Sequence, residues 1–428
     1  IVGAYAYEED FRQESHFGNA DQPQILAPIA AAPNPDGDYV TALSDLNTES
    51  YAVFGQMDYD LTDTVTLTGG LRYSMDEKSG SEAVRVIGYG IVPGLTLGGS
   101  GALAPAVDLT AASISFAPAA GVDSSVTIDP ATGLASRQLA NAWNALSGVA
   151  GIQWQPDDQT NYFFRYSRGY KSGGFNAGGI SQFPQTDEEL LDAFELGVKK
   201  GFGSTLQLNA TAYHYSYDGL QVPLDVVENG ITRTRFFNIA DAEAQGLELE
   251  ARFTPADNVR ILMSYAYNDS EVQDACCFID VADPLGLQPG AQPVGTPDSN
   301  GNQPQSLKGE MLPRTVPNKI GVNASYDVPL GDRGDLTLSA NYSWQDETYH
   351  GIFNRDYTQT PSSSQIDLVG VWTSQSDAFR VVGYVKNLFD EQGYDGATGA
   401  VRVLPSGISK TYYLTAPRTF GVQLQMHF

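Results

Sequence analysis

The sequence has few cysteines, few basic residues and no long apolar run, and each scarcity excludes a class of protein. Only 2 Cys occur in 428 residues, adjacent at Cys276 and Cys277, too few for a disulfide-stapled scaffold or a cysteine-type zinc site. With 24 basic and 51 acidic residues the formal net charge is −27, which argues against a nucleic-acid partner. No stretch approaches 18 consecutive apolar residues, so no transmembrane helix is expected.

Alternation of apolar and polar residues with a period of two is what the sequence does contain. In residues 65–74, 335–345 and 420–428, every second residue is mostly apolar or aromatic and its neighbours are mostly polar, which is typical of strands with one apolar face. About fourteen such segments recur. We expect them to begin near Ile1, Ser50, Val65, Trp143, Asn161, Asp192, Thr205, Ile231, Val259, Asn318, Asp335, Gln365, Phe379 and Thr419.

The connections between these segments alternate in length. Short turns are expected at 60–64, 155–160, 201–204, 254–258, 329–334 and 374–378. Long connections are expected at 14–49, 77–141, 173–191, 270–316, 349–364 and 389–418, with a middling one at 221–230. Aromatic residues also gather at both ends of the apolar positions, as two membrane interfaces would select. The pattern predicts an all-β, transmembrane, antiparallel up-and-down β-barrel, whereas a soluble sandwich or propeller would show neither regularity.

Charged residues occupy the polar positions of these strands, which would line the barrel interior. Both signs occur, and two interpretations stay open: a lumen that docks a polar plug or a ligand, or a channel wall whose charges pair with one another. The candidate plug-facing residues are Arg72, Arg165, Glu195, Lys199, Glu248, Glu250, Arg252, Arg260 and Lys319.

Five segments carry a resemblance to a known family. They are 162–176 (YFFRYSRGYKSGGFN), 194–200 (FELGVKK), 244–250 (AQGLELE), 386–390 (KNLFD) and 417–428. Together they resemble the C-terminal barrel of TonB-dependent outer-membrane receptors. The resemblance implies an outer-membrane protein of a Gram-negative bacterium that contacts lipid and lipopolysaccharide. It also implies that the terminal Phe428 is a signal for the barrel-assembly machinery.

The resemblance also implies that part of the family's architecture is missing. Family members have a barrel of about 22 strands filled by an N-terminal plug. This chain shows no plug and no energy-coupling box, so residues 1–428 are expected to form one domain, the C-terminal portion of such a barrel. Counting back from the last strand would place Ile1 in the ninth strand, and contact with a TonB-type energy complex would then require the missing N-terminal region.

Enzymatic and metal chemistry are not indicated. The four histidines lack metal-ligand spacing, there is no nucleophile elbow, and the glycines of 173–179 lack the strand–loop–helix context of a phosphate site. We therefore expect no catalytic residue, no cofactor and no metal. Cys276 and Cys277 could form a vicinal disulfide, be a fortuitous pair, or have a role confined to their loop.

Ligand-binding candidates lie near the expected outer rim. Aromatic rings can stack on a substrate and guanidinium groups can pair with an anionic one, although an aromatic girdle with rim salt bridges would use the same residues. The candidates are Tyr213, Tyr215, Tyr217, Arg233, Arg235, Arg168 and Lys171.

Three functions remain open from the sequence. The first is a receptor that captures a scarce small molecule, by resemblance most often a ferric siderophore-type chelate, and imports it with TonB-derived energy. The second is a plugless barrel that acts as a passive channel. The third is a structural barrel that binds a partner within an envelope complex, with its acidic loops as the contact surface.

Overall fold

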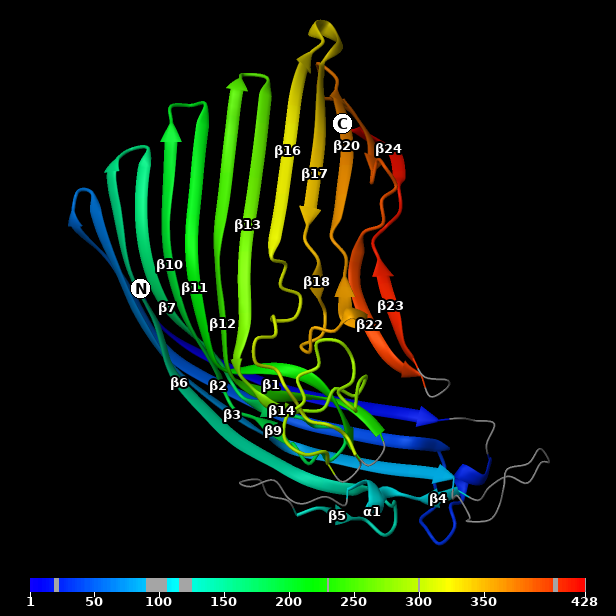
Figure 1. The fold of residues 1–428 in the computed structure, drawn as a ribbon. Coiled ribbons are helices and arrows are strands. Elements are labelled where there is room, and N and C mark those ends of the chain that lie inside the picture. The colour runs from blue at the N-terminus through cyan, green and yellow to red at the C-terminus, as the bar shows by residue number, and fades with distance from the viewer. Residues whose placement is uncertain are drawn as a thin grey trace.

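The computed structural model describes residues 1–18, 23–89, 106–114, 125–228, 231–298, 301–402 and 407–427. Fourteen long strands follow one another in an antiparallel sheet, each paired with the next long strand of the chain. Figure 1 shows them as a curved wall from the blue N-terminal strands to the red C-terminal ones, with short turns at the top and longer connections at the bottom. Among the described residues, no helix is long and apolar enough to cross a membrane. The predicted up-and-down topology is confirmed.

The long strands carry the labels of Figure 1. Their bounds are β1 (Val2–Gly18), β2 (Asp38–Thr62), β3 (Val65–Tyr89), β6 (Ala135–Asp157), β7 (Thr160–Lys171), β10 (Glu189–Phe202), β11 (Leu206–Glu228), β12 (Ile231–Ala256), β13 (Val259–Asp274), β16 (Asn318–Pro329), β17 (Asp335–Gln345), β20 (Ser363–Thr373), β21 (Phe379–Lys386) and β24 (Thr419–Met426). β1 and β24 are the two edges of this path, so within the described residues the sheet stays open.

Several strands extend further than the alternation predicted. The expected long connections 14–49 and 77–141 are partly strand, because β2 begins at Asp38, β3 continues to Tyr89 and β6 begins at Ala135. Residues 221–228 of the expected connection 221–230 likewise continue the β11–β12 ladder, which pairs from Leu206↔Phe253 to Glu228↔Ile231. Outside the bilayer, water or a covering loop can face either side of a strand. Backbone pairing therefore continues there without the alternation of apolar and polar residues that predicted the membrane-spanning parts.

The polar side of the sheet is its concave side. Glu82 of β3 accepts hydrogen bonds from the backbone N–H groups of Gly179 (3.1 Å) and Ile180 (2.9 Å), while Arg233 of β12 donates to the carbonyl of Gly178 (3.4 Å). β3 and β12 are five steps apart in the sheet, about 24 Å on a flat one at about 4.8 Å per step. Residues 178–180 can contact both strands only if the sheet curves toward them. The concave side is therefore the side on which Glu82 lies, and Arg72 lies on the same side of β3.

The connections opposite the short turns carry small elements of their own. They are η1 (Pro23–Leu26), β4 (Ala106–Asp108), α1 (Thr110–Ser113), β5 (Thr127–Ile128), β8 (Gly174–Phe175), β9 (Gln185–Thr186), β14 (Cys276–Phe278), β15 (Gln305–Ser306), β18 (Thr348–Tyr349), η3 (Asp356–Thr358), β19 (Gln359–Thr360), β22 (Tyr394–Arg402) and β23 (Gly407–Leu414). A further helical turn, η2 (Gly331–Arg333), belongs to the short β16–β17 connection.

The buried hydrophobic clusters lie among these connections and the strand extensions. One joins Val222, Ile239 and Val272 to Leu307 and Ile352 of two connections, and another joins Val84 and Val86 to Ile180. Nearer the short turns, the apolar side chains of the convex face are exposed, as expected for a surface that faces lipid.

Candidate functional site: the concave face and its outer mouth

The charged residues predicted to face the lumen all lie on the concave side of the wall. Register places Arg165 of β7 opposite Glu195 of β10, and Glu250 of β12 opposite Asn209 of β11. Most of these nine side chains are exposed, with Arg72 and Glu195 half-buried. Alternation along each strand is therefore enough to bring them to one surface.

Only one of the nine forms an ion pair within the described part of the chain. Arg260 pairs with Asp327 of β16 at 2.9 Å, and not with the carboxylates of β12 that precede it in the sequence. Glu195 and Glu250 accept hydrogen bonds from Tyr215 (3.1 Å) and Asn209 (3.2 Å). The other eight charges are exposed or half-buried and have no counter-ion among the described residues. This disfavours the interpretation of a channel wall whose charges pair with one another.

The three tyrosines predicted to bind a ligand share the concave side of β11. The rings of Tyr213 and Tyr215 stack with centroids 4.8 Å apart. Register places Tyr217 opposite Leu191 of β10, two residues from Glu189 on the same side of that strand. The carboxylates of Glu189 and Glu195 therefore border this group of rings. The structure thus brings the tyrosines together as an aromatic track along one strand.

The two arginines of β12 bind the β7–β10 connection and do not border the tyrosine track. Arg233 donates to the carbonyl of Gly178, and the buried Arg235 donates to that of Asn176 at 3.3 Å. A Cβ at Gly179 would lie 1.9 Å from the Arg233 guanidinium, so a larger residue there would displace this side chain. Both guanidinium groups therefore contact this loop, and their pairing with an anionic ligand stays a prediction.

The remaining candidates lie apart from the tyrosines. Arg168 shares the convex side of β7 with Tyr166, and its guanidinium is 3.8 Å from Asp192 of β10. Lys171 lies 3.7 Å from Glu189 at the outer end of the concave side. Arg168 therefore cannot join a ligand site on the concave face, because successive residues of a strand point to opposite sides. Phe428 lies outside the described residues.

Sequence reasoning missed a buried ion pair that fixes the β7–β10 connection. Arg137 of β6 donates through Nε to Glu82 of β3 at 3.0 Å, and both side chains are almost completely buried. The other oxygen of Glu82 accepts the N–H groups of Gly179 and Ile180 described above, and Asn176 holds the backbone of Phe236 on β12 through two hydrogen bonds. No sequence spacing signals these contacts, since their partners are 55 to 98 residues apart.

A second buried cluster joins the β13–β16 and β17–β20 connections. Arg355 is 1% exposed and donates to the carbonyl of Gly290 (2.8 Å), to Glu310 (3.3 Å) and to Gln305 (2.5 Å). Burial raises the pKa of Glu310 above its usual range, partly offset by Gln292 and Arg355. These contacts fold two long connections onto each other at the end of the wall opposite the short turns.

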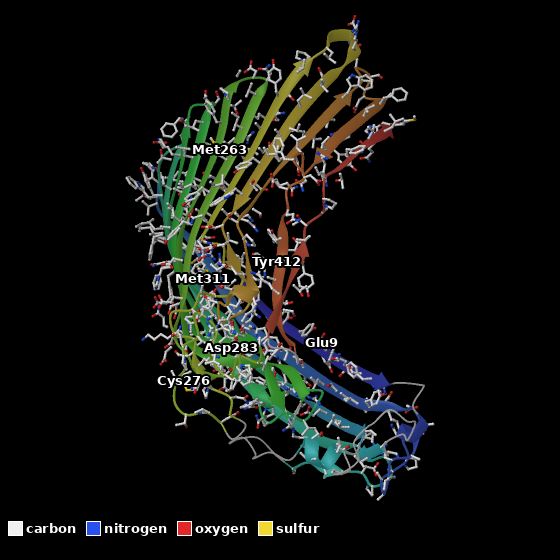
Figure 2. The ribbon with its side chains drawn as sticks, turned by 45° about the vertical axis from the view of Figure 1, so that its right-hand side comes forward. Glu9, Met263, Cys276, Asp283, Met311 and Tyr412 are labelled. Carbon is white, nitrogen blue, oxygen red and sulfur yellow. A yellow bond between two sulfur atoms is a disulfide. The ribbon has the colours of Figure 1, made fainter. Side chains whose placement is uncertain are left out.

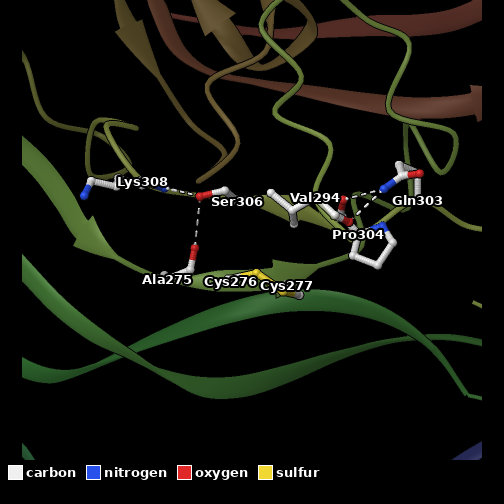
Figure 3. Close-up of a disulfide and its surroundings, with 8 residues drawn as sticks. All are labelled: Ala275, Cys276, Cys277, Val294, Gln303, Pro304, Ser306 and Lys308. Carbon is white, nitrogen blue, oxygen red and sulfur yellow. Dashed lines mark hydrogen bonds between the residues drawn. A yellow bond between two sulfur atoms is a disulfide. The ribbon is translucent and has the colours of Figure 1, made fainter. Parts of the chain in front are cut away.

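Cys276 and Cys277 form a vicinal disulfide at the start of this region (Figure 3). It lies on β14, whose Cys276 is paired with Ser306 of β15, and both cysteines are exposed. Of the alternatives left open by the sequence, the structure has the bonded pair.

A curved wall of antiparallel strands, apolar and aromatic outside, charged inside and with short turns at one rim, defines an outer-membrane β-barrel protein. A sequence model of the family described as TonB dependent receptor-like, beta-barrel matches residues 3–388. The chain belongs to this family, which places it in the outer membrane. No curated protein matches the sequence.

Solved structures share the fold at low sequence identity. The ferric yersiniabactin uptake receptor FyuA from Yersinia pestis matches all of this chain with a TM-score of 0.67 and 15% identity. The ferric-catecholate import receptor Fiu from E. coli K12, in its closed form, matches all of it with a TM-score of 0.58 and 14% identity. This chain spans 51% and 52% of those two chains. Identities this low show the fold alone.

Proposed function

We propose that the protein is an energy-coupled receptor that captures a scarce extracellular solute and imports it across the outer membrane. The observation that carries this proposal is the concave face, where eight of the nine candidate charges have no counter-ion among the described residues. Buried or enclosed charges are stable only when paired or hydrated, so such a surface suits a polar occupant that supplies complementary groups. A plug domain that moves during transport would be such an occupant.

The passive-channel alternative fits this surface less well. A permanent pore wall gains from charges that neutralise one another across adjacent strands, as Arg260 and Asp327 do. The structural-barrel alternative would need a contact surface among the acidic connections, and their most buried charges already bind one another, as Arg355 and Glu310 do.

A ferric siderophore-type chelate is the first candidate substrate. The family supports it, and so do the ferric yersiniabactin uptake receptor and the ferric-catecholate import receptor that share the fold. The tyrosine track could stack on the aromatic or ring portion of such a solute. We further propose that the protein contacts lipopolysaccharide, a TonB-type energy complex, and the barrel-assembly machinery through Phe428.

Uptake measurements test the transport proposal. Cells that express the protein should accumulate radiolabelled ferric chelate or another labelled solute, and accumulation should stop when the energy complex is disrupted. The double variant Arg165→Gln/Lys199→Gln on the concave face should lower uptake several-fold, because it removes charges that face the occupant. Arg168→Gln, on the convex face, is the matched control.

Two outcomes would refute active import. One is solute entry that persists without the energy complex, which would identify a passive channel. The other is equal uptake by the Arg165→Gln/Lys199→Gln variant and the Arg168→Gln control when both reach the outer membrane in equal amounts. That result would show that the concave charges take no part in transport.

A further inference from the structure

A hollow on the concave side of the N-terminal strands is not explained by any role assigned so far. It lies between β1, β2, β3, β6 and the end of β7, with Tyr5, Tyr7, Ser50, Arg72, Ser74 and Asp76 in its lining. Figure 2 labels Glu9, which follows Tyr7 by two residues on the same side of β1. The hollow encloses about 420 Å³ and is open to the interior of the curved wall.

Its apolar component consists of two exposed aromatic rings. Tyr5 and Tyr7 are 44% and 43% exposed, and their rings are nearly parallel, with an angle of 12° between them and centroids 6.4 Å apart. An aromatic face carries partial negative charge and attracts weakly positive C–H groups. Two such faces side by side offer a stacking surface for a ring with an apolar C–H side.

Its polar component is dominated by hydroxyl groups. Ser50 donates to Asp76 at 2.5 Å, and Arg72 donates to Ser74 at 2.9 Å. Tyr51, Ser147, Tyr170 and Ser172 complete the lining, and the two serines add further hydroxyl groups. Hydroxyls both donate and accept, and the carboxylate and guanidinium add fixed acceptors and donors, so the set matches a ligand rich in hydroxyl groups.

The charges of the hollow balance. Arg72 is its one cation in the lining and Asp76 its one anion, so the net formal charge is zero. The Arg72 guanidinium also lies against two rings, 5.4 Å from the centroid of Tyr5 and 5.7 Å from that of Phe54. An anionic chelate would be favoured by an excess of cations, which this lining lacks.

We propose that this hollow binds a saccharide: a pyranose-type ring packs its C–H face on Tyr5 and Tyr7, and its hydroxyls bond to Asp76, Arg72 and Ser74. The inference rests on the proposed import function and gives it a neutral polyol as substrate class. It differs from the ferric-chelate candidate in the charge of the ligand and in the strands that hold it.

Binding of glycans to the full-length protein in detergent tests the proposal. An array of neutral and acidic oligosaccharides selects the probe, and titration calorimetry with that oligosaccharide measures affinity. Tyr5→Ala and Asp76→Asn should each weaken binding of a neutral oligosaccharide about tenfold or more, equivalent to about 1.4 kcal/mol. Tyr5→Phe should retain most of the affinity because the ring remains.

Gln153→Ala, at an exposed position on the concave side of β6 outside both tyrosine groups, is the control for general damage to the concave face. Three results would overturn the assignment: no neutral oligosaccharide bound at millimolar concentration, binding that Tyr5→Ala leaves unchanged, or preferential binding of a ferric catecholate. Because the assay needs no energy complex, its failure is distinct from a failure of energy-coupled uptake, and the third result would leave the transport proposal intact.

Discussion

The membrane wall and the outer part of the molecule bury their side chains in opposite ways. The wall is the portion of the fourteen strands within about eleven residues of the short turns, the length that spans a bilayer. There, apolar side chains such as Leu71 and Leu196 are 64% and 61% exposed on the convex face. In the outer part, made of the strand extensions and long connections, Ile239 and Val272 are 1% and 0% exposed.

This difference shows that two kinds of force act in one chain. The wall depends on its backbone ladder and on lipid around its apolar face, because no protein core backs it. The outer part resembles a soluble protein, with hydrophobic clusters and buried ion pairs that join elements distant in sequence. Substitutions should therefore act by different mechanisms in the two regions.

The largest effect is expected from the buried ion pair of the outer part. Glu82→Ala would leave Arg137 buried without a carboxylate and would remove the acceptor for the N–H groups of Gly179 and Ile180. We expect a local loss of about 3–5 kcal/mol. Hydrogen exchange should accelerate in residues 174–187 and leave the amides of β16 and β17 unchanged.

Glu8→Ala on β1 removes an exposed carboxylate and is the control for that experiment. If Glu82→Ala and Glu8→Ala give the same protection in residues 174–187, the ion pair does not hold the connection.

The next largest effect belongs to the wall, where adjacent residues face lipid and lumen. Ile152→Arg would place a charge on the exposed convex face of β6 and should cost about 2–4 kcal/mol if it lies near the bilayer centre. Gln153→Arg, one residue along, faces the concave side and should change stability little. Folding equilibria in lipid vesicles measure both, and equal losses would contradict the assignment of the two faces.

Period-two alternation predicted the wall because each of its strands must present one side to lipid and one to the interior. Residues such as Leu338 and Ser339 carry this signal locally, so strand number and order followed from the sequence alone. The same rule also separates Arg168 from Arg165, because residues three apart lie on opposite sides of a strand. The prediction of Arg168 as a ligand-binding residue did not take this difference in side into account.

The outer part could not be predicted in the same way. The role of Arg233 and Arg235 depends on where residues 176–179 fold, and those residues are more than fifty positions away in the sequence. Glu82 and Arg137 are likewise recognisable only once β3 and β6 are paired. Loop packing and long-range ion pairs have no sequence period, so only the structure identifies them.

A smaller effect, with opposite signs in the two regions, is expected from pH. Burial raises the pKa of Glu310, so the folded outer cluster retains its proton to higher pH than the unfolded chain, and stability falls as pH rises through that window. Hydrogen bonds from Thr160 and the Gln159 N–H lower the pKa of Asp157, the last residue of β6 at the short β6–β7 turn. Its contribution to stability is lost as pH falls through the lowered value.

Acidification from neutral pH should therefore slow opening of the cluster around Glu310 and, at lower pH, speed fraying of the Asp157 turn. Hydrogen exchange corrected for its intrinsic pH dependence measures both segments in one sample. Glu310→Gln should flatten the response of the cluster and leave the turn unaffected. A parallel response of the two segments would exclude these carboxyl groups as its source.

The smallest effect on stability is expected at the concave charges of the wall. Lys319 is exposed, and the described residues give it no counter-ion, so Lys319→Gln should change the free energy of unfolding by less than about 0.5 kcal/mol. Arg260→Gln removes a pair 2.9 Å from Asp327 and should cost slightly more, up to about 1 kcal/mol at a surface site. Urea titration of both variants measures the difference. A loss above about 1 kcal/mol for Lys319→Gln would mean that this charge stabilises the wall itself, and a loss near zero would agree with a charge that has no structural role there.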